Sequence, residues 1–182
     1  CHMSMLDIDT EILDIAELVS FNKSPLTDIK TFTQRCHLGL VEGGCSNTEN
    51  IETLKKFREM CDILVVMGEC AVWGGLPAMR NTIPLGECLE EAYLNSLTSE
   101  PGENTVPYHE DLPKILDRVY ACNEIVKVDY SIPGCPPSPN HIRHRHRSPR
   151  GAARLPNSVR FLAGRPPYRA HLRLAWPPLR SV

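Results

Sequence analysis

Long apolar runs are missing from this 182-residue sequence. No stretch approaches the roughly 18 consecutive apolar residues that a membrane-spanning helix needs. The N-terminus also carries no recognisable secretory or twin-arginine signal. We expect a cytoplasmic protein with no membrane partner. Hydrophobic residues still make up 42% of the chain, which is enough for one compact domain with a real core.

Closely spaced cysteines are missing too. The shortest spacing between any two is nine residues, and the eight cysteines lie at positions 1, 36, 45, 61, 70, 88, 122 and 135. This spacing disfavours a zinc finger, which needs cysteines a few residues apart. The chain also does not have the composition of a short secreted scaffold held by disulfides. The thiols are therefore buried side chains, metal ligands or catalytic groups.

The last forty residues lack acidic side chains and lysine. Residues 143–182 contain 10 arginines and six prolines, whereas residues 1–142 hold all 22 acidic residues and the other 10 basic ones. We therefore divide the chain into a domain at 1–142 and a basic tail at 143–182. The tail fits a nucleic-acid arm, a disordered segment or an out-of-frame product of GC-rich DNA, and arginine without lysine favours the last. With no recognisable nucleic-acid-binding fold, we expect no nucleic-acid partner.

Apolar periodicity predicts an α/β domain. Residues 61–68, "CDILVVMG", are continuously apolar over the length of a strand, as in a parallel sheet covered on both faces. Residues 46–60 combine a polar cap with apolar positions at helical spacing. The other predicted elements are helices at 6–18, 84–96 and 111–119 and strands at 17–22, 36–44 and 124–132. This order favours a doubly wound parallel sheet.

Three short segments follow predicted strands that should end at the same edge of the sheet. They are Glu42-Gly43-Gly44, Glu69-Cys70-Ala71 and Gly134-Cys135-Pro136. Two thiols meeting there, with glycine N–H groups nearby, suit a soft metal centre such as an iron–sulfur cluster. The alternative is that both cysteines are small buried hydrophobic side chains, as most free cysteines are. The flanking glycines and prolines favour the metal.

The other cysteines are interpreted as structural. Cys36, Cys61, Cys88 and Cys122 lie in or near predicted strands and helices. Cys45 precedes a helix, where a thiol can become more acidic, but no histidine partner would make it a nucleophile.

Two stretches carry a family resemblance. "VEGGCSNTENIETLKKFREMCDILVVMGECAVWGGLPAMRN" (41–81) and "VKVDYSIPGCPPS" (126–138) resemble the small subunit of nickel–iron hydrogenases, and more narrowly the cytoplasmic NAD-reducing type. The motifs G-x-C-A-x-x-G-G and P-G-C-P-P are also shared with the 20 kDa cluster subunit of NADH:quinone oxidoreductase (complex I). "AVWGGLPAMRN" and "SPLTDIK" lean toward the hydrogenase. The resemblance covers residues 1–142.

The resemblance implies a flavodoxin-like fold that binds a proximal [4Fe-4S] cluster. Cys1, Cys70 and Cys135 would be metal ligands, while a fourth ligand and the first strand of the sheet would precede Cys1. The residues expected to line the cofactor are Glu42, Gly43, Gly44 and Gly134. Small subunits of this type have also been linked to FMN.

The implied role is electron transfer. The nickel–iron site would belong to a separate large subunit, and electrons would pass through the cluster towards diaphorase subunits that carry flavin and NAD. The alternatives are the cluster subunit of complex I and a metal-free flavodoxin-like or nucleic-acid-binding module with structural cysteines. The complex I family has two adjacent cysteines at this position, whereas His2 follows Cys1 here, and this difference counts against the complex I alternative.

Four further residues have two interpretations each. Glu42 could relay protons or contact the large subunit, or could simply accept loop N–H groups. Trp73 and Arg80 could anchor a subunit interface, or could pack locally and face solvent. His109 could ligate a metal, although a lone loop histidine is more often a surface residue.

Overall fold

The computed structural model describes residues 1–24, 29–98, 105–144 and 172–175. The elements are α1 (His2–Leu6), α2 (Glu11–Leu18), β1 (Val19–Phe21), β2 (Cys36–Glu42), β3 (Cys45–Asn47), α3 (Thr48–Met60), β4 (Cys61–Met67), α4 (Glu69–Trp73), η1 (Leu76–Thr82), α5 (Leu85–Tyr93), β5 (Ile115–Tyr120), α6 (Cys122–Ile125), β6 (Tyr130–Ile132), α7 (Pro139–His144) and β7 (Leu172–Ala175). No helix among these elements is long and apolar enough to cross a membrane.

The main sheet has five strands in the order β1-β7-β2-β4-β6, and every neighbouring pair is parallel. Glu42, the last residue of β2, pairs with Met67, the last residue of β4. Met67 in turn pairs with Ile132 at the end of β6. Because these strands end in one row, the segments that follow them meet at the same edge of the sheet.

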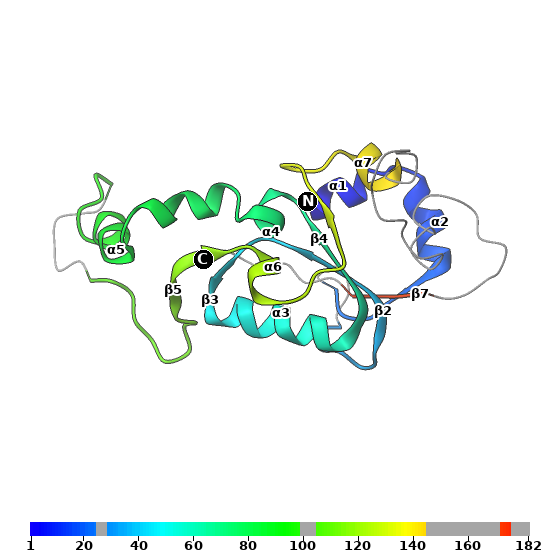
Figure 1. Ribbon diagram of the computed structural model, residues 1–182, viewed down its shortest axis with the longest axis horizontal. Helices are drawn as coiled ribbons and strands as arrows, with labels where there is room; N and C mark the ends of the chain where they lie inside the picture. Colours follow the sequence, from blue (N-terminus) through cyan, green and yellow to red (C-terminus); the bar gives the residue numbers. More distant parts are fainter. Residues whose placement is uncertain (25–28, 99–104, 145–171, 176–182) are drawn as a thin grey trace.

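Helices cover both faces of the sheet (Figure 1). Alternate residues of β4 point to opposite faces, as the two-residue period of a strand requires. Leu64 and Val66 join Leu54 and Phe57 of α3 in one buried cluster. Val65 and Met67 join a second cluster with α1, α2 and α7. The predicted doubly wound α/β fold is confirmed.

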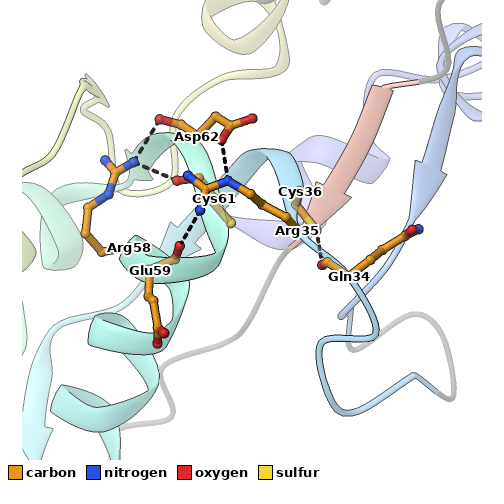
Figure 2. Close-up of polar contacts among 7 residues, drawn as sticks. All are labelled: Gln34, Arg35, Cys36, Arg58, Glu59, Cys61 and Asp62. Atoms are coloured by element: carbon orange, nitrogen blue, oxygen red, sulfur yellow. Dashed lines mark hydrogen bonds and ion pairs between the residues drawn. The ribbon is translucent and has the colours of Figure 1, made fainter.

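Polar contacts fix the opposite edge of the sheet, where α3 meets β4 (Figure 2). The guanidinium of Arg58 donates to the main-chain oxygens of Cys61 at 2.7 Å and Asp62 at 2.8 Å. Arg35, just before β2, donates to the Asp62 carboxylate at 2.7 Å and to the Glu59 carbonyl at 3.1 Å. The bonds to Glu59 and Cys61 satisfy carbonyls at the end of α3, which have no partner within the helix itself, and the bonds to Asp62 join the arginines to β4.

The same arginine reaches the segment that leads to β6. Arg58 also donates to Asp129, and this carboxylate accepts the main-chain N–H of Leu64 at 2.8 Å. The main chain of Asp129 returns a bond to the Leu64 carbonyl at 3.0 Å. Burial alone would raise the pKa of Asp129, but the bonds from Arg58 and Leu64 hold it below its ordinary value. This ion pair therefore ties the entry to β6 against β4.

Three predicted elements differ from the structure. The helix expected at 111–119 is wrong, because Ile115–Tyr120 forms strand β5, antiparallel to β3. The strand expected at 124–132 is wrong in its first half, where α6 forms with the Glu124 carboxylate accepting the Ala121 N–H at 2.8 Å. Of the helix expected at 6–18, only Glu11–Leu18 forms a helix, α2, because α1 ends at Leu6 and the chain turns at Asp9, whose φ is 64°.

Two strands were not expected at all, the short β3 that precedes α3 and the strand β7. Leu172–Ala175, within the arginine-rich tail, forms β7 between β1 and β2. The rest of the tail beyond residue 144 lies outside the described residues.

Candidate metal centre

The three cysteines predicted as ligands all lie at the carboxyl edge of the sheet. Cys1 precedes α1, Cys70 is the second residue of α4, directly after β4, and Cys135 follows β6. Cys1 and Cys70 are partly buried, and Cys135 is exposed. The structure therefore brings to one edge three thiols that come from separate parts of the sequence.

Gly68 is the point at which the three ligand segments touch. It lies between β4 and α4 with a φ of 89°, in a region that residues with side chains rarely adopt. A Cβ atom at this position would overlap the Sγ atom of Cys1 and lie 3.6 Å from the carbonyl of Gly134. The absence of a side chain at Gly68 therefore makes room for the Cys1 thiol beside the segments of Cys70 and Cys135.

The short helix that carries Cys70 ends on two glycines. Gly74 caps α4 in the left-handed conformation, and its N–H donates to the carbonyl of Cys70 at 3.0 Å. A Cβ atom on Gly75 would lie only 2.9 Å from the main-chain nitrogen of Cys70. The spacing G-x-C-A-x-x-G-G thus has a direct structural reason, since the chain folds back on Cys70 through these glycines.

The turn that carries Cys135 also depends on a glycine. Gly134 has a φ of 137°, and a Cβ atom there would overlap the main chain of Pro137. Pro137 is among the fully buried residues, whereas Cys135 is exposed. The tight turn packs the proline inward and leaves the thiol at the surface of the sheet edge.

Two carboxylates hold the main chain beside these cysteines. Glu42, at the end of β2, accepts the His2 N–H at 2.6 Å, and its oxygen lies 3.2 Å from the main-chain nitrogen of Cys1. Glu69 accepts the N–H of Gly134 at 2.9 Å. The main-chain N–H of Glu69 donates in return to the Gly134 carbonyl at 2.9 Å. We call this pair of bonds the Glu69–Gly134 bridge.

The Cys135 thiol acts electrostatically on the thiol of Cys70. Burial raises the pKa of Cys70 above its ordinary value, and the neighbouring Cys135 raises it further. Two thiolates near each other repel, so a cation or a metal cluster that neutralises them would be favoured. Metal binding at these cysteines would therefore release protons.

The three predicted ligands are all thiols, the donor type that an iron–sulfur cluster takes. Among the described residues, no three histidine, cysteine or acidic side chains come together as a ready site for one ion. In a [4Fe-4S] cluster each thiolate binds a different iron, so the ligands surround the cluster instead of meeting at one point. Cys1, Cys70 and Cys135 come from separate segments of the chain with glycines beside them, so they could bind different irons of one cluster.

The glycines predicted to line a cofactor at the end of β2 are engaged in packing. A Cβ atom on Gly44 would lie 3.0 Å from Cγ1 of Val119 and 3.3 Å from the Cys70 carbonyl. Gly43 has a φ of 87°, and its carbonyl accepts the Cys122 thiol at 3.6 Å. Gly134 likewise gives its N–H to Glu69, so these glycines shape the edge of the sheet.

Three other residues singled out in the sequence have surroundings that do not involve the three thiols. Trp73 is 65% exposed at the end of α4. Arg80 donates to the carbonyls of Leu116 at 2.7 Å and Asp117 at 3.3 Å, so it anchors η1 to β5. His109 is exposed, with its Nδ1 atom 3.4 Å from the carboxylate of Asp111.

The sequence did not predict the roles of Gly68 and the Glu69–Gly134 bridge. Gly68 could have been noticed as one of several glycines around Cys70, but its contact with Cys1 depends on the fold. The bridge depends on the register in which Met67 of β4 pairs with Ile132 of β6. Neither the register nor the bridge produces a recognisable sequence pattern in either segment alone.

The other buried cysteines form two neighbouring pairs, Cys36 with Cys61 and Cys45 with Cys122. Cys36 and Cys61 are register partners on β2 and β4, and burial together with Cys36 raises the pKa of Cys61 to about 12. A hydrogen bond with Cys45 and burial raise the pKa of Cys122, while the same bond lowers that of Cys45.

Comparison with known proteins identifies the family. Residues 1–145 match the family described as NADH ubiquinone oxidoreductase, 20 Kd subunit. A chain in the crystal structure of an NAD+-reducing [NiFe]-hydrogenase in the H2-reduced state has a TM-score of 0.73 and 46% sequence identity, over 77% of this chain and 78% of that chain.

Curated relatives belong to hydrogenases. The NAD-reducing hydrogenase HoxS subunit delta of Cupriavidus necator is 55% identical over 143 residues, which are 78% of this chain and 68% of that protein. A subunit of the F420-non-reducing hydrogenase of Methanothermobacter marburgensis is 38% identical over 139 residues, which are 75% of this chain and 45% of the relative.

The chain belongs to the NADH ubiquinone oxidoreductase 20 kDa subunit family. Within that family it is similar to the small subunit of NAD-reducing nickel–iron hydrogenase, as the stretches "AVWGGLPAMRN" and "SPLTDIK" predicted.

Proposed function

We propose that this chain is the electron-transfer small subunit of an NAD-reducing nickel–iron hydrogenase. The observation that supports this most is the convergence of Cys1, Cys70 and Cys135 at one sheet edge, around Gly68. The similarity to the HoxS delta subunit adds the type of enzyme. In this proposal the chain does not itself split hydrogen, because the nickel–iron site belongs to a partner subunit.

Each residue at the edge has a distinct task in this proposal. Cys1, Cys70 and Cys135 would supply thiolates to a [4Fe-4S] cluster, which when bound would accept and release single electrons. Gly68 leaves room for the Cys1 thiol. Glu42 holds the main chain at Cys1 and His2, which argues for a structural role for this carboxylate and gives no support to a proton relay.

The partners follow from the position of the site and its surroundings. The segment after Cys70 exposes Trp73 by 65%, Leu76 by 69% and Met79 by 67%. Exposed apolar side chains of this size, gathered in one short segment beside a redox site, are typical of a subunit interface. We assign this surface to the hydrogenase large subunit, with diaphorase subunits receiving the electrons. The proposed location is the cytoplasm.

FMN is the less supported cofactor. At the end of β2, where glycines could approach a flavin, Gly44 instead packs against Val119 and the Cys70 carbonyl. We retain FMN only as a prediction that extraction of the complete protein tests, by the appearance or absence of free flavin in the extract.

The second candidate is the cluster subunit of a quinone-reducing complex I. The matching family model supports it, because its description is that of the 20 kDa subunit. The residue after Cys1 counts against it, since the resemblance to complex I calls for adjacent cysteines and His2 occupies that position. The two functions differ in electron donor and in partner.

Anaerobic purification of the complete protein from its own cells distinguishes the two. We expect a nickel-containing subunit to copurify and the complex to reduce NAD+ with hydrogen. Cys70→Ser should abolish this activity, whereas Cys88→Ser, on α5, should retain it. Copurification with membrane subunits and NADH:quinone activity without hydrogen dependence would favour complex I. A chain free of iron and partners would contradict both.

A further inference from the structure

The Glu69–Gly134 bridge joins the two segments that immediately precede predicted ligands. Glu69 comes directly before Cys70, and Gly134 comes directly before Cys135. Two hydrogen bonds of 2.9 Å connect them, one through the Glu69 main chain and one through its carboxylate. The bridge therefore constrains both ligand positions at once.

The bridge continues the sheet beyond the ends of its strands. The pairing of β4 with β6 ends at Met67 and Ile132, and the Gly68 N–H still donates to the Ile132 carbonyl at 2.8 Å. One residue further on, the Glu69 main chain donates to Gly134. Beyond this point the chain enters α4, so no β4 carbonyl is left to accept the Gly134 N–H, and the Glu69 side chain accepts it.

Side-chain length and charge both matter at this position. The Glu69 carboxylate has to reach across to the next segment, and an aspartate would be one methylene shorter. A carboxylate beside cluster thiolates adds negative charge, which disfavours a further electron on the cluster.

We propose that Glu69 is a positioning residue that fixes the Cys135 turn to the Cys70 turn and places negative charge beside the cluster they hold. This inference rests on the proposed function, since it concerns the same cluster. It adds a residue outside the ligand set that sets both how well the cluster is retained and how easily it is reduced.

Two conservative variants separate the hydrogen bond from the charge. Glu69→Gln keeps an oxygen acceptor at the same reach and removes the charge, whereas Glu69→Asp keeps the charge and shortens the reach. The complete protein is purified anaerobically, its iron and acid-labile sulfide are measured, and loss of iron to a chelator is followed by the visible absorbance of the cluster. Glu52→Gln and Glu52→Asp, on the exposed face of α3, are the matched controls.

The expected result is that Glu69→Gln retains iron as well as wild type and that Glu69→Asp loses it roughly 10-fold faster, the size of effect known for residues that support metal ligands. Glu69→Gln should also have a less negative midpoint potential than wild type. The Glu52 variants should change neither quantity. Circular dichroism of all the proteins shows that each one folds.

Three outcomes would overturn the inference while leaving the proposed function intact. They are a wild-type cluster with both Glu69 variants unchanged in iron loss, faster loss in Glu69→Gln than in Glu69→Asp, and an unchanged potential in Glu69→Gln. A wild-type protein without iron and sulfide would instead overturn the proposed function itself. The two failures are therefore distinguishable in one set of samples.

Discussion

Substitution of Gly68 by alanine tests the geometry of the site most sharply. The φ of 89° and ψ of 156° at Gly68 belong to a region that is essentially reserved for glycine. Placing a side chain in such a region costs on the order of 1–3 kcal/mol of unfolding free energy. In addition, the new Cβ atom would overlap the Sγ atom of Cys1, so that the Cys1 segment would have to move.

The two contributions can be separated with a double-mutant cycle. Gly68→Ala, Cys1→Ala and the double variant are compared by denaturant unfolding monitored by circular dichroism. If the overlap with the thiol matters, Gly68→Ala should lower the unfolding free energy by less in the Cys1→Ala background than in wild type. The difference between the two backgrounds should be at least about 0.5 kcal/mol. The strain at the backbone should remain in both backgrounds. Gly68→Ala should also lower the iron content of the anaerobically purified protein.

Gly86→Ala is the matched control for this substitution. Gly86 lies in the first turn of α5, where a Cβ atom would meet no atom within 4 Å beyond its chain neighbours and the backbone of its own helix, and its φ is not in the left-handed region. Alanine there should be neutral or stabilising by about 0.5–1 kcal/mol. Equal effects of Gly68→Ala and Gly86→Ala on stability and iron content would refute the proposed contact among the ligand segments.

The other predictions concern the framework of the domain. Asp129→Asn should destabilise the fold by about 1–3 kcal/mol at neutral pH, because it removes a charged partner of Arg58. Since the pKa of Asp129 is lowered in the folded state, its stabilisation is complete above the unfolded pKa of about 3.9 and is lost as pH falls through the folded value. The difference between the two proteins in urea unfolding should therefore shrink in acid; a constant difference would contradict this ion pair. Phe57→Ala should cost about 3–5 kcal/mol in the same assay, because Phe57 is fully buried, and a cost below about 1 kcal/mol would contradict its place in the core. In the metal-free protein Cys135 should react with iodoacetamide much faster than Cys61, which is buried and has a pKa raised to about 12; peptide mass mapping measures this, and equal rates would contradict the burial.

Much of the sheet could be predicted because its strands have a strong local signal. Residues 61–67 are almost entirely apolar, as a strand covered on both faces must be, and the structure has β4 over these same residues. The helix α3 was equally clear, since polar residues precede apolar positions that recur on one face; its cap is Asn47, which accepts the Asn50 N–H at 2.9 Å, in place of the expected serine or threonine. In both cases local sequence and tertiary environment favour the same structure.

The failures occur where distant contacts decide the local structure. The segment Ile115–Tyr120 becomes a strand because β3 pairs with it. The Asn81 side chain also donates to the Val119 carbonyl at 2.9 Å and accepts the Val119 N–H at 2.7 Å. Neither partner is close in sequence. The strand β7 depends likewise on neighbours more than 100 residues earlier in the chain, so its own composition gave no indication of it.

The candidate site was predicted only in its outline. A parallel sheet brings the ends of its strands together, so Cys70 and Cys135 could be placed at one edge from topology alone. Cys1 was added by the family resemblance. The contact of Gly68 with Cys1 and the two bonds of the Glu69–Gly134 bridge require the actual register and backbone angles, which no sequence pattern specifies.

The most direct test of the account is the metal content of the complete protein. Anaerobic purification followed by iron and acid-labile sulfide analysis should give about four of each per chain, the content of a [4Fe-4S] cluster. Reduction should produce the electron paramagnetic resonance signal of such a cluster. Cys70→Ser and Cys135→Ser should lose both, while Cys88→Ser should keep them. Wild-type protein without iron and sulfide, or a cluster unchanged in Cys70→Ser and Cys135→Ser, would contradict the central claim that these thiols hold it.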